Sequence, residues 1–294
     1  MNTIETTILS IVIMIGLGYI LKKIDFLSDK DIDSLNKIVI NLLLPCMIFS
    51  ALYSADLSLL PKLSILTVLI LISSFITGIT SYLILKKLNF DDRKIWSVLI
   101  TIMIANTAFM GYPVNLGIYG SEGLLRAIFC DIATTCIFII LSFALALKFG
   151  GSIKTAIRKI IVFPPLWAII LGLIFNLLLL PIGGVLDKTI NYLAGGTIPL
   201  IMLSLGISID LSGIYRSKFM VLFTTIMKLA IFPIIALIFA RFFGLVDLQY
   251  NVGIIEAAMP SGMLSLVLAI TYNLDYDLAS ESTKIGRASC RERV

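Results

Sequence analysis

The chain has 294 residues, of which 59% are hydrophobic and only 14% are charged, and its mean hydropathy is +1.05. A soluble domain of this length needs a charged exterior that this composition cannot supply, so the chain is predicted to be a membrane protein with several spans. Because the sequence contains no histidine, imidazole metal sites, Ser–His or Cys–His nucleophile pairs and histidine proton relays are excluded.

The net charge and the cysteines limit which binding partners, disulfides and metal sites the chain is expected to have. A formal net charge of +5 would suggest a nucleic-acid partner for a soluble protein. Here the basic residues lie in short clusters between apolar runs, so lipid topology explains them better and no nucleic acid is expected. The four cysteines form no CxxC pair, so neither a disulfide framework nor a zinc site is supported, and no cofactor or metal is expected.

Nine apolar runs are long enough to cross the hydrocarbon core, which takes about 20 helical residues. The first could be mistaken for a signal peptide, but Lys22 and Lys23 follow it rather than precede it, so it is predicted to be an uncleaved span. The runs cover residues 4–21, 35–55, 63–85, 95–118, 124–147, 161–180, 190–209, 218–240 and 250–272.

Basic residues are distributed unequally between the connections. The odd-numbered connections hold fourteen and the even-numbered ones hold four. The odd connections are therefore predicted to face the cytoplasm, with the N-terminus outside and the chain in the cytoplasmic membrane. The odd set is Lys22, Lys23, Lys30, Lys37, Lys86, Lys87, Arg93, Lys94, Lys148, Lys154, Arg158, Lys159, Arg216 and Lys218, and the even set is Lys62, Arg126, Lys188 and Arg241.

The second and seventh runs carry similar motifs. PCMIFSALYSAD spans Pro45 to Asp56 and PLIMLSLGISID spans Pro199 to Asp210, and an asparagine (Asn36 or Asn191) precedes each motif at a similar distance. The fourth and ninth runs each contain one interior proline. Both pairs lie five spans apart, and an odd number of helices per repeat places the two halves in opposite orientations, as in inverted-repeat transporters.

This repeat predicts an all-α integral membrane fold of ten helices, five in each repeat. The first repeat covers residues 1–147, a short cytoplasmic linker covers 148–160, and the second repeat covers 161–280 with helices six to nine only. Residues 281–294 contain no apolar run, and we expect a foreign tail there in place of a tenth helix, with a native polar tail as the alternative.

The interior prolines predict a binding site. Pro113 and Pro260 each remove a helical hydrogen bond, and the half-helix beginning near each proline presents unpaired N–H groups and a positive dipole end. If the two spans cross, these ends converge near the midplane and suit an anion such as a carboxylate. A structural kink is the alternative. The predicted site comprises Asn106, Gly111, Tyr112, Pro113, Pro260, Ser261 and Gly262.

Charged residues inside apolar runs are costly unless they are paired or functional. Glu256 lies one turn before Pro260, so it could bind a coupling proton or cation, or it could pair with Lys228 of the neighbouring span as a structural contact. Asp131 is expected to be solvated near the outer end of its span. Asn41 and Pro45 mark a loosened second helix and are added to the predicted substrate-binding residues, with packing between helices as the alternative.

Several of these segments resemble the auxin efflux carrier family, which includes the plant PIN-FORMED carriers. NTAFMGYPVNLGIYG resembles the fourth helix of that family and AAMPSGMLSLVLAITYNLDYDLAS its ninth, while LLLPCMIFSAL and TIPLIMLSLGISI are similar to its second and seventh. The resemblance covers about residues 1–280. It implies a ten-helix fold of the bile-acid-symporter and auxin-carrier type, with helices four and nine crossing beside the substrate, and it carries Asn106, Pro113 and Pro260 over by position.

The fifth-to-sixth connection has only about 13 residues and lacks the long loop of the plant carriers. The chain therefore looks like a compact prokaryotic member, and the resemblance implies substrates such as malate- or malonate-like carboxylates rather than auxin.

The resulting prediction is a secondary carrier of organic anions, with the lipid bilayer and a small anion as partners, a proton or sodium as coupling ion, and a homodimer as an allowed assembly. Sodium coupling of the bile-acid-symporter type is the alternative within this class, and a channel or a membrane receptor lies outside it. An enzyme is not expected, because no HExxH motif, nucleophile–base pair or carboxylate dyad is visible.

Overall fold

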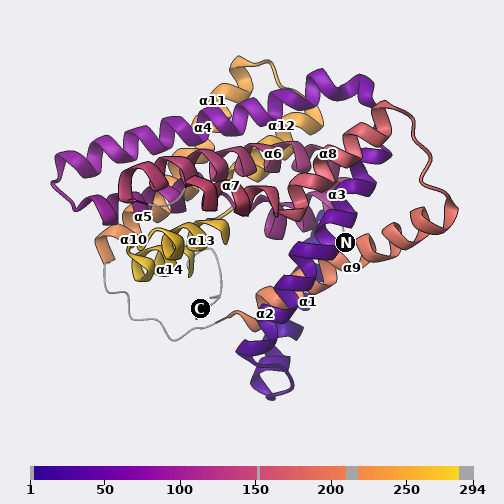
Figure 1. Ribbon diagram of the computed structural model, residues 1–294, viewed down its shortest axis with the longest axis horizontal. Coiled ribbons are helices and arrows are strands. Elements are labelled where there is room, and N and C mark those ends of the chain that lie inside the picture. The colour runs from indigo at the N-terminus through magenta and orange to yellow at the C-terminus, as the bar shows by residue number, and fades with distance from the viewer. Residues whose placement is uncertain (1–2, 151–152, 210–217, 285–294) are drawn as a thin grey trace.

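The computed structural model describes residues 3–150, 153–209 and 218–284, and nearly all of these residues are helical (Figure 1). In addition to α-helices there are three π-helical turns (η1, η3 and η4) and one 3-10 turn (η2). The elements are α1 (Thr3–Lys23), α2 (Asp29–Ile38), η1 (Val39–Leu43), α3 (Leu44–Tyr53), η2 (Leu57–Leu59), α4 (Leu60–Lys87), α5 (Asp92–Met103), η3 (Thr107–Gly111), α6 (Tyr112–Phe149), α7 (Ile153–Ile161), α8 (Pro164–Leu177), α9 (Gly184–Ile207), α10 (Lys218–Ile226), η4 (Met227–Ile231), α11 (Phe232–Phe242), α12 (Asp247–Ala257), α13 (Leu264–Thr271) and α14 (Tyr276–Lys284).

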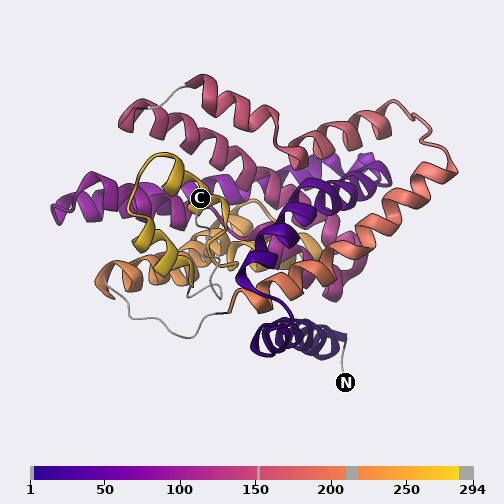
Figure 2. The same cartoon turned by 60° about the horizontal axis from the view of Figure 1, so that its bottom comes forward.

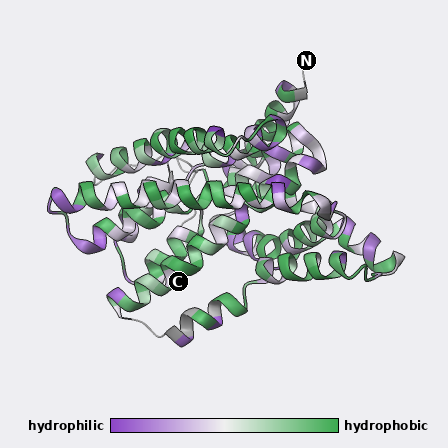
Figure 3. Cartoon of the chain, turned by 90° about the horizontal axis from the view of Figure 1, so that it is seen from above, coloured by the Kyte–Doolittle hydropathy of each residue, from purple (hydrophilic) through white to green (hydrophobic). Residues whose placement is uncertain are grey.

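The helices follow the apolar runs, although they divide them differently. Six helices in the described part of the chain are long and apolar enough to cross a membrane. The fourth and ninth runs are interrupted and the sixth forms the shorter helix α8, whereas the end of the fourth run and the fifth run join in α6. Gly120 separates these two parts with φ 63° and ψ −156°, a conformation that favours glycine. Hydrophobic residues line the helices and hydrophilic residues gather at many of the turns (Figure 3).

Two predicted boundaries lie at or within helices of the structure. The segment predicted as a linker contains the helix α7 (Ile153–Ile161). The helix α14 continues beyond residue 280 to Lys284, with Ser282 and Thr283 buried. The rest of the predicted tail lies outside the described residues, as does Asp210 of the second repeat motif.

Each π-helical turn ends two residues before a proline. The turns η1, η3 and η4 end at Leu43, Gly111 and Ile231, and the prolines are Pro45, Pro113 and Pro233. Proline has no N–H group and its ring presses on the carbonyl one turn back, so a wider turn accommodates it without ending the helix. The helical backbone of these spans therefore continues past each proline through a wider, π-helical turn.

The helices form two groups that pack mainly within themselves. The smaller helix group consists of α1, α2–α3, α8 and α9, and the larger consists of α4, α5, α6 and α10–α14. Figures 1 and 2 show α1 and α9 side by side, away from α13 and α14. The groups meet where α6 contacts α1 and α3 and where η3 contacts α9. Each group draws helices from both predicted repeats.

Reciprocal hydrogen bonds join the two repeat motifs inside the smaller helix group. The Ser50 hydroxyl donates to Asn191 Oδ1 at 2.6 Å, and the Ser204 hydroxyl donates to Asn36 Oδ1 at 2.7 Å. Both serines lie five residues after the proline of their own motif. A two-fold relation between the segments predicts such paired contacts, because each asparagine then meets the serine of the other motif.

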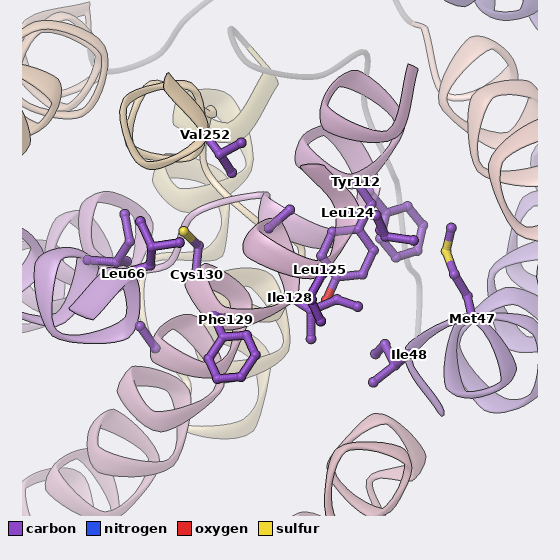
Figure 4. Close-up of a cluster of buried hydrophobic side chains, with 14 of the residues drawn as sticks. Met47, Ile48, Leu66, Tyr112, Leu124, Leu125, Ile128, Phe129, Cys130 and Val252 are labelled. Carbon is purple, nitrogen blue, oxygen red and sulfur yellow. The ribbon is translucent and has the colours of Figure 1, made fainter. Parts of the chain in front are cut away.

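A large apolar cluster connects the groups and places the start of α6. Figure 4 shows Tyr112 beside Leu124 and Leu125, with Met47 of α3 facing them and Cys130 between other helices. Tyr112 is completely buried. Burying side chains of this size stabilises the fold by about 1.5–3 kcal/mol each, so the first turn of α6 is held firmly.

Candidate functional site

The fourth and ninth spans are both interrupted, and their interruptions cross. Between α5 and η3 the chain is unwound at residues 104–106, and between α12 and α13 it is unwound at residues 258–263. Ala105 and Ser261 pair as an isolated antiparallel β-bridge. The Asn106 amide donates to the Pro260 carbonyl at 2.7 Å, and the Gly262 amide donates to the Ile104 carbonyl at 2.9 Å. The backbones therefore satisfy each other at the crossing, as a span in lipid requires.

Glycine is needed at one position of the crossing. A Cβ added to Gly262 would lie 2.6 Å from the Ala105 carbonyl oxygen, closer than side-chain carbons approach backbone atoms. The unwound segment at residues 258–263 can approach the one at residues 104–106 this closely only because Gly262 has no side chain. The sequence predicted a close backbone approach at Gly262, and the backbone that approaches it is that of Ala105 in the other interrupted span.

The first interruption lies earlier than Pro113, so one part of the sequence interpretation is wrong. Pro113 lies within continuous helical backbone, and η3 accommodates it. The Gly111 amide donates to the Asn106 carbonyl at 3.3 Å and the Tyr112 amide donates to the Thr107 carbonyl, so neither amide faces an open site. Pro260, by contrast, lies in the crossing itself. The half-helix of the fourth span begins at Thr107.

Two buried nitrogen groups near the crossing have no hydrogen-bond partner. The Asn106 side chain is 4% exposed and its Nδ2 is unpaired within the described part of the chain. Lys228 is 1% exposed, and its Nζ has neither a hydrogen bond nor an ion pair with a described residue. The Lys228 ammonium instead lies 3.8 Å from the ring centroid of Phe232. Donors buried without acceptors are costly, so both are positioned to bind an acceptor.

A small cavity joins Lys228 to the crossing. Its volume is about 10 Å³, close to the space that a single water needs. It is lined by Thr224, Thr225, Lys228, Pro260, Ser261 and Ser282. The hydroxyl of Ser282 also has no partner among the described residues. The cavity therefore brings several hydroxyl groups close to one cation.

Glu256 lies on the other side of the same crossing and does not pair with Lys228. Its side chain is 0% exposed, and its Oε1 accepts a hydrogen bond from Asn115 Nδ2 at 2.7 Å. The carboxylate rests against Gly111, where an added Cβ would be 2.5 Å from the carboxyl carbon and nearer still to both oxygens. Gly111 therefore makes room for Glu256, which differs from the predicted role of exposing its amide.

Asp131 belongs to this region, although it was expected to be solvated. It is 8% exposed and accepts hydrogen bonds from the Thr107 hydroxyl and, at 2.9 Å, from the Tyr112 hydroxyl. These contacts tie the start of the half-helix to the later part of α6. Sequence analysis missed the cluster because Asp131 and Thr107 are 24 residues apart; the only signal was a carboxylate inside an apolar run.

Asn41 and Pro45 lie away from this cluster. Asn41 is exposed and its amide donates to the Lys37 carbonyl at 2.8 Å within its own helix. Pro45 lines an apolar groove with residues of α3, α8 and α9. Neither residue reaches the crossing in this structure.

A larger pocket opens between the two helix groups. Its volume is about 390 Å³, within the range of small-molecule sites. It is lined by α3 and the turn after it, by α6 and by α9, and the lining includes Met47, Ser50, Asp56, Leu116, Glu122 and Gly195. The pocket, called the vestibule below, lies beside the first part of α6, which begins at the crossing.

Paired interrupted helices inside an apolar bundle, with polar groups at the interruption, define the architecture of a membrane transporter. The comparisons with known proteins agree. Residues 3–289 match the family described as "Membrane transport protein". The chain belongs to this family, the auxin efflux carrier family, and the resemblance found in the sequence is confirmed.

Similar proteins include two archaeal relatives and one plant relative. An uncharacterized transporter of Methanothermobacter thermautotrophicus is 39% identical over 93% of this chain and 90% of its own length. An uncharacterized transporter of Methanocaldococcus jannaschii is 33% identical over 94% of this chain and 91% of its own. Auxin efflux carrier component 8 of Arabidopsis thaliana is 29% identical over 44% of this chain and 37% of its own.

Proposed function

We propose that the protein is a secondary carrier of small organic anions and that the carboxylate of the anion binds beside Lys228 at the helix crossing. The observation that carries this proposal is the ammonium of Lys228, buried in the membrane region without a hydrogen-bond acceptor among the described residues. A buried cation of this kind is costly unless it meets an opposite charge. Glu256 lies too far away to pair with Lys228, and a guest carboxylate supplies an opposite charge in direct contact.

The surroundings of Lys228 favour an oxyanion. Thr224, Thr225 and Ser261 line the same cavity, and hydroxyl groups can donate to carboxylate oxygens. Asn106 adds an amide donor at the crossing. Because these donors occupy a small volume among apolar side chains, the site suits one carboxylate of a small mono- or dicarboxylate. Auxin, which appears in the name of one relative, also carries a carboxylate.

Binding requires the helices to move. The cavity beside Lys228 is about 10 Å³, too small for a carboxylate, whereas the vestibule between the groups is about 390 Å³. Rocking of the smaller helix group against the larger would open a path between them, and rocking around a fixed central site is how inverted-repeat carriers alternate access. The proposed location is the cytoplasmic membrane with the N-terminus outside. The distribution of basic residues between the connections supports this orientation.

Replacing Lys228 by methionine tests the proposal. Lys228→Met keeps much of the side-chain volume and removes a buried ammonium that has no hydrogen-bond acceptor among the described residues, so we expect the variant to fold with a similar melting temperature. Uptake of radiolabelled malonate, malate and succinate into proteoliposomes should fall at least tenfold, and the thermal shift produced by these anions should disappear. Asn106→Ala should weaken the same shift.

Arg241→Met removes a cation from the end of α11 and serves as the matched control, which should retain uptake. Wild-type transport of these carboxylates by Lys228→Met would contradict the site. Conductance far above carrier turnover would instead identify a channel.

A further inference from the structure

Glu256 has an incomplete set of partners in a completely buried position. It lies in the last turn of α12, immediately before the crossing, with 0% exposure. Oε1 accepts one hydrogen bond, from the neutral amide of Asn115 at 2.7 Å. Oε2 has no partner within the described residues. The carboxylate of Glu256 already lies against the backbone of Gly111, so this side chain cannot move further toward η3.

The charges that face Glu256 come from two elements. The later part of α6 contributes Asp131, and η4 contributes Lys228. Tyr112 and Cys130 of α6 also lie within its electrostatic reach. The helices α4 and α11 pack against α12 as well, and they carry charges only toward their ends, at Lys62, Lys86, Lys87 and Arg241.

Lys228 is thus the cation that compensates Glu256, and it does so without contact. Asp131 differs, because two hydroxyl groups donate to it. A carboxylate with one neutral donor in a dry environment depends on a compensating cation for its charge. If a guest anion neutralises Lys228, as the proposed function requires, Glu256 loses that compensation.

We infer that Glu256 binds a proton at Oε2 when the anion binds beside Lys228, so that the carrier moves one proton with each anion. This inference rests on the proposed function and adds its coupling ion. In the empty carrier, the charges of Lys228 and Glu256 balance across the crossing. In the carrier loaded with one carboxylate, the anion balances Lys228 and Glu256 is neutral. For a guest with one ionised carboxylate, the buried charge is therefore similar in both states, which allows both to reorient in the membrane.

A gradient experiment tests this coupling. Full-length protein is reconstituted into proteoliposomes, the membrane potential is clamped with valinomycin and equal potassium, and radiolabelled malonate, malate and succinate are supplied outside. With the outside one pH unit more acidic, one-proton coupling should give about tenfold accumulation of the transported anion, because one pH unit equals a tenfold concentration ratio. Anion exchange without a gradient is measured in the same vesicles.

Glu256→Gln should lose the accumulation driven by the pH gradient, and its ratio of accumulation to exchange should fall at least fivefold, since the glutamine resembles a permanently neutral carboxyl that cannot exchange a proton. Asp25→Asn, at an exposed carboxylate in the turn after α1, is the matched control and should accumulate anion as the wild type does. Accumulation by Glu256→Gln equal to wild type would overturn the inference, as would wild-type accumulation that follows a sodium gradient and ignores pH. If the wild type exchanges none of the three anions, the proposed function fails as well, so the two failures are distinguishable.

Discussion

Gly111→Ala tests whether the carboxylate of Glu256 rests where the structure places it. The backbone at Gly111 has φ −65° and ψ −45°, so alanine fits the helix and alone should stabilise it by about 0.5–1 kcal/mol. The added methyl would lie 2.5 Å from the carboxyl carbon of Glu256. The carboxylate must then move and lose its 2.7 Å hydrogen bond with Asn115, and leaving buried polar groups unpaired costs about 1–3 kcal/mol.

The net expectation is a loss of about 1–2 kcal/mol from these two opposing effects, or a melting temperature lower by about 2–8 °C for a chain of this size. Scanning fluorimetry of the purified protein measures this shift. Gly16→Ala is the matched control, because an added Cβ meets nothing within 4 Å there, and it should not lower the melting temperature.

On a Glu256→Ala background, Gly111→Ala should no longer be destabilising, because the carboxylate that it displaces is absent. An equal loss on both backgrounds would refute the reasoning. So would a Gly111→Ala variant that tolerates heating as well as Gly16→Ala does.

Three further changes probe the rest of the structure. Ser50→Ala and Ser204→Ala should each lower the free energy of unfolding by about 1 kcal/mol, with additive effects in the double variant because the two bonds lie far apart along the helices; a strongly non-additive result in chemical denaturation would contradict independent bonds. Gly206→Ala should lower the melting temperature or the folded yield, since an added Cβ would overlap the Ile15 carbonyl oxygen of α1 and lie 2.8 Å from the Gly18 Cα; a wild-type melting curve would contradict this packing. Lys148 lowers the pKa of Asp92 from 3.8, so the ionised carboxylate stabilises the fold above about pH 3.8, and this stabilisation is lost as pH falls through the folded-state pKa. Asp92→Asn should therefore lower the melting temperature slightly at pH 7 and leave it unchanged well below pH 3.8. An equal shift at both pH values would contradict the ion pair.

The crossing of the fourth and ninth spans could be predicted because helix-disfavouring residues recur in apolar runs five spans apart. Pro260 in particular lies in the crossing. The first interruption could not be located from Pro113, because the π-helical turn before that proline keeps the backbone helical. The unwound residues 104–106 include alanine and isoleucine, which fit ordinary helix, so it is the pairing with residues 260–262 that stabilises the unwinding.

The polar contacts around the crossing were less predictable than the helices. Hydropathy identifies Asp131, Lys228 and Glu256 as costly residues, but it does not say which partners they meet. The contact of Asn115 with Glu256 joins residues 141 positions apart, and it depends on how α6 and α12 pack. The reciprocal bonds of Asn36 with Ser204 and of Asn191 with Ser50 had one signal in the sequence. The two asparagines precede the prolines of their motifs by similar distances, and a two-fold relation brings equivalent residues together.

The backbone of the crossing is nearly symmetric, whereas its charges are not. The two amide-to-carbonyl bonds of the bridge mirror each other, yet Lys228 and Glu256 both come from the second predicted repeat. The equivalent span of the first repeat, α4, has no charged residue between Lys62 and Lys86. A guest held by Lys228 would therefore sit to one side of the molecular dyad. Its affinity when the carrier faces outward need not equal its affinity when the carrier faces inward, so the concentrations that half-saturate uptake and efflux can differ although the two halves share one backbone plan.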